Sequence, residues 1–133
     1  MKRQIVFISG KYRARTKLGV LWNIYKARRA AIKLWQRGYA TICPHLNSAL
    51  MPGNPDLFLK GDLKILAKCH IIYMLKNWEY SDGACLERLE AQRRGLTVWY
   101  EDKPVEIVAM YDPCEYKVEP ITSLELQEAG VIK

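Results

Sequence analysis

The sequence lacks long apolar runs, because none of its 133 residues belongs to a stretch of the ~18 residues that a membrane-spanning helix needs. Its basic start, "MKRQIVFISGKYR", is followed by too short an apolar run for a signal peptide. The two histidines and four cysteines include no Cys-x-x-Cys pair, so we expect no zinc site. We expect a cytoplasmic protein that needs no membrane, metal or other cofactor. Its cysteines should be reduced and buried; they are Cys43, Cys69, Cys85 and Cys114.

Two phosphate-binding motifs are also missing. The loop "SGKYRARTKLG" contains neither Gly-Lys-Ser/Thr at a helix start nor Gly-x-Gly-x-x-Gly. The net charge of +7, from 21 basic and 14 acidic residues, favours anionic partners only weakly. One helical stripe is basic, but no aromatic residues interleave with it, so we interpret it as a solvated face and rank nucleic-acid binding last. This stripe comprises Lys26, Arg29, Lys33 and Arg37.

Strand-like and helix-like patterns alternate along the chain. Apolar strands are expected at 4–9, 39–43, 70–75, 96–101 and 105–111, and helices at 18–37, 56–68, 82–94 and 123–129, with a loop over 44–55. This order predicts an α/β fold in one domain, residues 1–133, with a core over 4–110 and a C-terminal tail over 111–133. The expected architecture is a doubly wound, mostly parallel five-stranded sheet, flavodoxin- or Rossmann-like, flanked by helices. Ligands bind beyond the carboxyl ends of such strands, so the loops after Ser9, Cys43 and Leu75 should share one cleft.

The stretch "WEYSDGACLERLEA" follows an apolar strand and begins a helix. Ser81 or Asp82 can cap this helix, and Gly83 leaves its backbone open to a ligand. Glu87 lies one turn further on the same face and should stay ionised near the positive helix end, where it could attack an electrophilic carbon. On spacing alone, a capped helix with Glu87 on a solvated surface is the favoured interpretation.

Other loops supply further candidates, each with a plainer alternative. Gly10, Tyr12 and Arg13 follow the first strand, together with Lys11, and could form an ordinary basic surface loop. Asp62 could donate a proton if its pKa were raised, or could be a solvated carboxylate paired with Lys64 or Lys68. His45 and Asn47 follow the second strand and could simply be exposed.

Taken together, four segments resemble the nucleoside 2-deoxyribosyltransferase superfamily, and are most similar to its small deoxyribosyltransferase-like branch. The resemblance covers roughly residues 4–100, and its most specific part is Ser81-x-Gly83-x-x-x-Glu87 after an apolar strand. The segments are "ISGKYR", "NIYKARRAAIKLWQRGYATICPH", "GDLKILAKCHIIYML" and "WEYSDGACLERLEAQRRGLTV".

The resemblance implies cleavage or transfer at the N-glycosidic bond of 2-deoxyribonucleosides or their 5′-monophosphates. Glu87 would form a covalent deoxyribosyl ester, and Asp62 would help protonate the departing base, as in retaining glycosidases. The 5′-phosphate N-hydrolases of the superfamily carry a serine where Ser81 stands and an arginine where Arg13 stands, which favours a monophosphate. The implied substrate-binding set is Ser9, Gly10, Tyr12, Arg13, His45, Asn47, Ser81 and Gly83.

Some features depart from that pattern. The transferases usually carry Gly-Pro where this chain has Gly10-Lys11, and Cys85 replaces a residue that is often small. No residue in 104–133 matches the part by which a neighbouring subunit completes the site in better-known members. A homodimer or higher homo-oligomer is therefore implied by analogy only. The alternative function is a non-catalytic nucleotide-binding or nucleotide-sensing protein with the same cleft.

Overall fold

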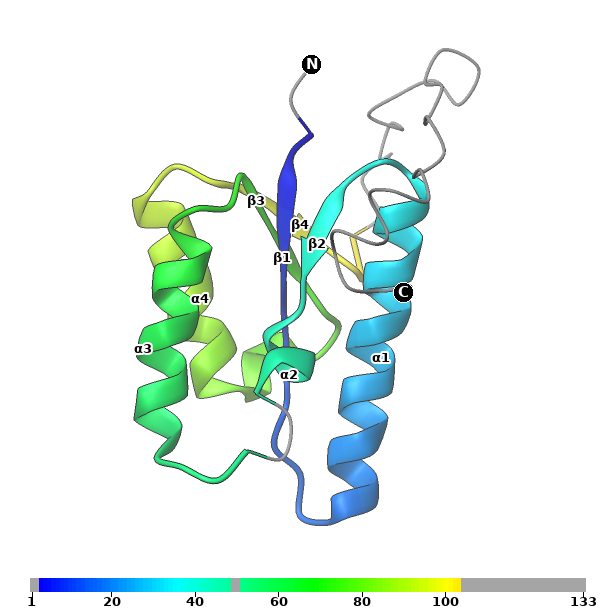
Figure 1. The fold of residues 1–133 in the computed structure, drawn as a ribbon, viewed down its shortest axis with the longest axis vertical. Helices are drawn as coiled ribbons and strands as arrows, with labels where there is room; N and C mark the ends of the chain where they lie inside the picture. The colour runs from blue at the N-terminus through cyan, green and yellow to red at the C-terminus, as the bar shows by residue number, and fades with distance from the viewer. Residues whose placement is uncertain (1–2, 49–50, 104–133) are drawn as a thin grey trace, which may run out of the picture.

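The computed structural model describes residues 3–48 and 51–103. Within these residues the chain is an α/β protein, in which helices flank a four-stranded parallel sheet on both faces (Figure 1). The expected strand 105–111, helix 123–129 and tail 111–133 lie outside the described residues. None of the helices in the described ranges has the length and apolar character needed to cross a bilayer.

The sheet has the order β2-β1-β3-β4, and every neighbouring pair is parallel. Its strands are β1 (Ile5–Ser9), β2 (Ala40–Ile42), β3 (Ile71–Met74) and β4 (Thr97–Tyr100). They confirm the four strands predicted before residue 103, each shorter by one or two residues. In the register, Phe7 of β1 lies opposite Ile42 of β2 and Ile72 of β3. This order is compatible with a Rossmann-like fold.

Three longer helices confirm the predicted ones to within two residues at each end. They are α1 (Lys17–Gln36), α3 (Pro55–Leu66) and α4 (Asp82–Arg93). The sequence interpretation was wrong in part of 44–55, where α2 (Pro44–Asn47) forms one helical turn. Pro44 was taken as a loop residue, yet proline suits the first position of a helix because its φ is already fixed. A second short element, the 3₁₀ turn η1 (Trp78–Tyr80), precedes α4.

The sheet separates two apolar clusters among the described residues. On one face, Val6 and Ile8 of β1 pack with alanines and Leu34 of α1. On the other, Phe7 packs with residues of α3, β3 and α4, including Leu66. Strand side chains alternate between faces, so Ser9 shares the α4 side with Phe7. Cys43 and Cys69 are buried, reduced thiols, as predicted, whereas Cys85 is half-buried and Cys114 lies outside the described residues.

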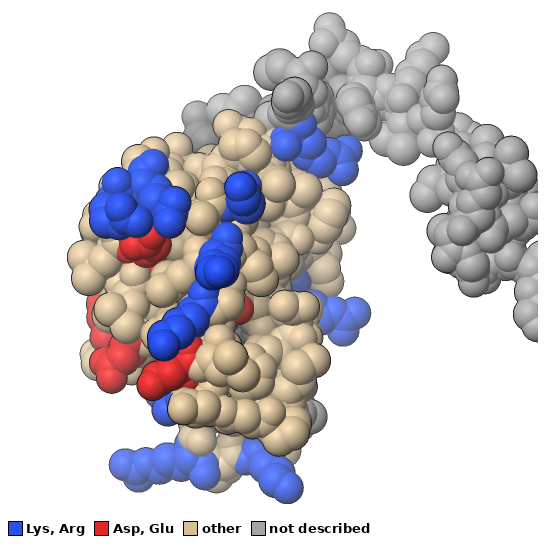
Figure 2. Space-filling view, turned by 60° about the vertical axis from the view of Figure 1, so that its left-hand side comes forward, with Lys and Arg blue, Asp and Glu red and all other residues tan. Residues whose placement is uncertain are grey.

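Basic side chains are spread over the outside of the molecule. Lys60 and Lys64 of α3 and Lys68 just beyond its end are exposed at a spacing of four residues, and Figure 2 shows Lys and Arg side chains in a row over this side. On α1, Arg29, Lys33 and other basic residues are also exposed. The positive charge of the chain is therefore mostly a property of solvated helix faces.

Candidate functional site

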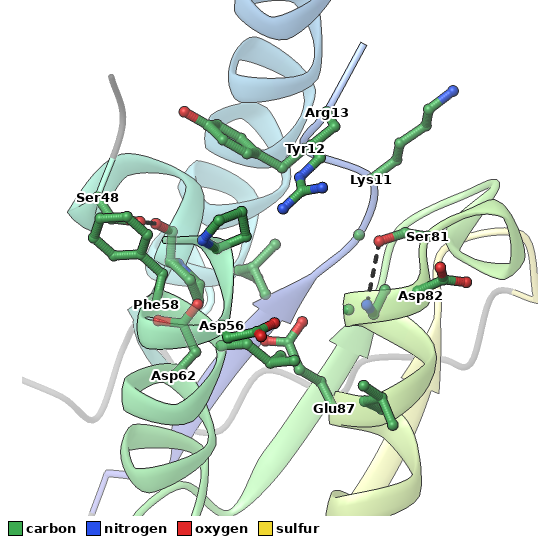
Figure 3. A pocket seen from close by; sticks show the side chains of 18 of the residues that line it. Lys11, Tyr12, Arg13, Ser48, Asp56, Phe58, Asp62, Ser81, Asp82 and Glu87 are labelled. Carbon is green, nitrogen blue, oxygen red and sulfur yellow. Dashed lines mark hydrogen bonds between the residues drawn. The ribbon is translucent and has the colours of Figure 1, made fainter. Parts of the chain in front are cut away.

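A cavity of about 570 Å³ lies beyond the carboxyl ends of β1 and β3. This is the point where the strand order reverses, because the chain runs outward from β1 to β2 and then back to β3 and β4. Three segments line the cavity together with α3 and α4, which confirms that the loops after Ser9, Cys43 and Leu75 share one cleft (Figure 3). They contribute Gly10 to Arg13, Pro44 with Ser48, and Tyr80 with Ser81.

The loop after β1 is held in place by specific contacts. The Leu75 N–H donates to the Ser9 carbonyl at 2.8 Å. A Cβ on Gly10 would lie 2.7 Å from the Leu75 side chain, so this position accepts only glycine without a shift. Further along, the buried Asn23 of α1 donates from Nδ2 to the carbonyls of Tyr12, at 3.1 Å, and of Arg13, at 3.4 Å. The strand end and α1 together place both side chains at the cavity.

Glu87 is buried rather than solvated, so the surface interpretation was wrong. The hydroxyl of Ser9 donates to Glu87 Oε1 at 3.0 Å. Burial raises the pKa of Glu87 to about 8; the Ser9 hydrogen bond opposes this, and the charge of Asp62 adds to it. The expectation of an ionised Glu87 was therefore also wrong at neutral pH. Glu87 is the sixth residue of α4, and the helix dipole acts mainly within the first turn, too far away to offset desolvation.

Asp62 lies on α3, faces the cavity and is half-buried. Burial raises its pKa to about 6. Within the described part of the chain neither Lys64 nor Lys68 forms an ion pair with it. The reason is geometric, because Lys64 is two positions away on a helix, where side chains do not face each other, and Lys68 lies beyond the end of α3. The structure thus places Asp62 at the cleft rather than in an ion pair, and its role as a proton donor stays a prediction.

The N-terminus of α4 opens into the cavity. Ser81 is its cap, as predicted, and its Oγ accepts the Ala84 N–H at 3.2 Å (Figure 3). Gly83 lines the cavity, and a Cβ there would meet Ser81 Oγ only at 3.9 Å, so packing within the chain does not require glycine. Among the residues described, the N–H groups of Asp82 and Gly83 have no acceptor. They remain available to a ligand.

The guanidinium of Arg13 points into the cavity in Figure 3. Within residues 3–48 and 51–103 this side chain forms no hydrogen bond or ion pair. The cavity is nevertheless less basic than the net charge of +7 suggests. Its lining carries four carboxyl groups, against Lys11 and Arg13; they belong to Asp56, Asp62, Asp82 and Glu87.

Sequence reasoning missed one side of the cavity. Asp56 and Leu59 lie on α3 at three-residue steps before Asp62, and Phe58 lies beside them. The three- and four-residue spacing was available in the sequence and places these side chains on the helix face that Asp62 uses.

Three predicted binding residues are placed differently or not described. Asn47 is exposed and does not line the cavity, because α2 turns it away, so that prediction was wrong. Ser9 lies beneath the cavity and contacts Glu87 rather than its open space. The side chain of His45 lies outside what the structure describes. Among the described residues no three His, Cys, Asp or Glu side chains are grouped so that they could hold a metal ion.

Comparison with known proteins gives one result. No curated protein sequence matches the chain significantly. The model of one protein family, described as a domain of unknown function (DUF4406), matches residues 6–100. This range includes nearly all of β1, the helices α3 and α4 that carry Asp62 and Glu87, and β4. The match spans most of the chain and the whole of the cavity lining, and the protein therefore belongs to the DUF4406 family.

Proposed function

We propose that the cavity binds a 2-deoxyribonucleoside or its 5′-monophosphate and that the protein cleaves or transfers its N-glycosidic bond through a covalent ester on Glu87. The observation that carries this proposal is the pairing of Glu87 with Asp62. The two carboxyl groups come from neighbouring helices, interact electrostatically and face one cavity of about 570 Å³. A volume of this size suits a small-molecule ligand, and paired carboxyl groups suit chemistry at an anomeric carbon.

The chemistry is a double displacement. An ionised Oε of Glu87 attacks C1′ while the C1′–N bond breaks, and its electron pair stays on the base nitrogen. Asp62 supplies the proton that the departing base takes up. In the second step a water molecule, or the nitrogen of another base, attacks C1′ and displaces the Glu87 carboxylate. The Asp62 carboxylate takes the proton that this nucleophile loses, which restores both groups.

Ser9 has a positioning role in this scheme. Its hydroxyl holds one oxygen of Glu87 at 3.0 Å and favours the ionised form that the first step needs. Removing the hydroxyl should therefore slow the attack without removing any contact to the sugar.

The loop after β1 and the N-terminus of α4 offer partners for the ligand's 5′ end. The guanidinium of Arg13, the hydroxyl of Ser81 and the N–H groups of Asp82 and Gly83 can donate hydrogen bonds to a phosphate or hydroxyl oxygen. The carboxylate of Asp82 opposes a phosphate there, so the proposal covers both nucleosides and monophosphates. The ring of Phe58 offers an aromatic surface for a base.

One observation favours a second candidate, a nucleotide-binding protein without turnover. With a pKa of about 8, Glu87 is mostly neutral at pH 7, and a neutral carboxyl group donates hydrogen bonds rather than attacking carbon. A protein of this kind would hold its ligand through the same side chains and leave it intact.

Incubation with each deoxynucleoside and each 5′-monophosphate, followed by chromatography of the free base, tests the first candidate. We expect base release by the parent, none by Glu87→Gln, and an unchanged rate in Glu79→Gln, which alters an exposed glutamate outside the cavity. Calorimetry on the same samples separates the candidates. Binding without base release over a long incubation would support the second candidate and contradict the first.

A further inference from the structure

The outward face of α1 carries large apolar side chains that nothing in the described structure covers. They are 43–79% exposed. In Figure 1, α1 lies on one side of the sheet, and α3 and α4 lie on the other. We call this set the outward stripe; it comprises Leu18, Leu21, Trp22, Tyr25, Ile32 and Trp35.

The outward stripe lies opposite the helix face that packs on the sheet. The buried residues of α1 include Ala27, Ala30 and Leu34, and at ~100° per residue the stripe is centred about half a turn away from them. Five of its positions, with Arg28 added, also have a regular period, because 18, 21, 25, 28, 32 and 35 alternate in steps of three and four. Such a period places side chains in one straight seam, as in helices that pack along their length.

The area of the stripe approaches what an interface between proteins needs from each partner. With aromatic side chains offering ~150–250 Å² each, six residues at these exposures present on the order of 600 Å² of mostly apolar surface. A stable interface takes ~800 Å² from each partner, and monomeric proteins seldom leave such a patch open to water.

We propose that the outward stripe docks against the same stripe of a second copy, with the two α1 helices antiparallel about a twofold axis between positions 26 and 27. Antiparallel pairing about this point joins positions whose numbers add to 53. Leu18 then meets Trp35 of the other copy, and Leu21 meets Ile32. The only charged residue in the seam, Arg28, meets the ring of Tyr25.

The charges of α1 decide in favour of this arrangement over other ways of joining two copies. The helix contains five basic residues and no acidic one, so a parallel pairing would set Arg28 against Arg28. In the antiparallel pairing each Arg28 lies over a tyrosine ring, and Arg29 reaches the neighbouring Trp22 of the other copy. A guanidinium over an aromatic ring is an attractive contact. Trp22 and Tyr25 already stack within one copy at 5.6 Å between ring centroids, which makes a flat platform for these cations.

Two other occupants would also suit a basic apolar face, namely the C-terminal segment of the same chain and an anionic lipid surface. Residues 104–133 contain six acidic and two basic residues, and anionic lipid attracts a basic helix with an apolar face. The effect of salt distinguishes both of them from a second copy. Either occupant would be released by salt, because its attraction to α1 is electrostatic. A dimer of two basic helices should instead be strengthened by salt, which screens their repulsion.

Sedimentation of the full-length protein at increasing ionic strength tests the occupant. We expect a mass of about twice 15.4 kDa, with a dissociation constant that falls as salt rises. Leu21→Glu should weaken the dimer at least tenfold, whereas Leu89→Glu, the same change at a similarly exposed leucine of α4, should leave it unchanged. A monomer at all concentrations would overturn the proposal. So would a dimer that salt weakens, or binding of the protein to anionic vesicles that Leu21→Glu abolishes.

Cysteine cross-linking tests the direction and register. Positions 21 and 32 lie about 16 Å apart along one helix, too far for a disulfide within one copy. The double variant Leu21→Cys/Ile32→Cys should give a disulfide-linked dimer on mild oxidation, whereas each single variant should not. Linked dimers from either single variant would contradict the antiparallel register, and no linkage in the double variant would contradict the interface.

Discussion

The pH dependence of base release is the sharpest test of the two carboxyl groups. The proposed reaction needs Glu87 ionised and Asp62 protonated, yet their pKa values are about 8 and about 6. At pH 7 each group is therefore in its productive form in about one molecule in ten, and both are in about one in a hundred. We expect kcat/KM to peak near pH 7 and to fall about tenfold per pH unit below 6 and above 8.

Replacing Asp62 with Asn should change the shape of this profile as well as its height. The requirement for a protonated Asp62 disappears, so the fall above pH 8 should be lost. The charge that helps to raise the pKa of Glu87 is also gone, so the remaining rise should have its midpoint below about 8. Chromatography of the free base from about pH 5 to about pH 10 measures both profiles, and Glu79→Gln serves as the control with the parental shape.

Two results would refute this reasoning. A parental rate that does not fall below pH 6 and above pH 8 would show that these two groups do not control the reaction. A fall above pH 8 that survives in Asp62→Asn would show that the required acid is another residue.

Three further predictions concern stability and binding. The pKa of Glu87 rises from 4.5 to about 8 on folding, so its contribution to stability is complete below pH 4.5 and is lost by pH 8. Thermal unfolding should therefore show Glu87→Gln to be as stable as the parent near pH 5 and more stable by a few kcal/mol near pH 9. A stability difference that does not change with pH would contradict the burial of Glu87. Gly10→Ala should destabilise the protein by about 1–3 kcal/mol, because its new Cβ contacts the Leu75 side chain. Gly83→Ala should leave the stability unchanged or raise it by up to about 1 kcal/mol. Equal melting temperatures of the two variants would refute this contrast. Ser81→Ala should cost about 1 kcal/mol as a lost cap and should raise KM for monophosphates more than for nucleosides; equal effects on both would remove Ser81 from the phosphate.

Much of the fold was predictable because its signals are local. The helix that bears Glu87 begins at a capping serine and ends before Gly95, whose φ of 75° suits glycine, and both residues stand in plain sequence order. The parallel order of strands likewise follows from alternating patterns. The start of α2 was missed because Pro44 is equally common in loops and at the first position of a helix.

Several residues of the cavity lining were predictable from the sequence, but the electrostatics of the cavity were not. The protonation of Glu87 depends on Ser9, which is 78 positions away, and on the helix that carries Asp62. No local pattern contains that information. Asn47 was assigned to the cleft because it follows a strand, and the single turn of α2 was enough to direct it elsewhere.

The sheet that separates the two apolar clusters also acts as a partition between the two sides of the molecule. Val6 and Ile8 face α1, whereas Phe7 and Ser9 face the helices that carry the carboxyl groups. The partition has two crossing points, because Ile8 of the α1-side cluster also lines the cavity and Asn23 of α1 donates to the carbonyls of Tyr12 and Arg13. Substitutions on the outward stripe avoid both residues, so a lineage could alter how the protein associates while keeping its pocket.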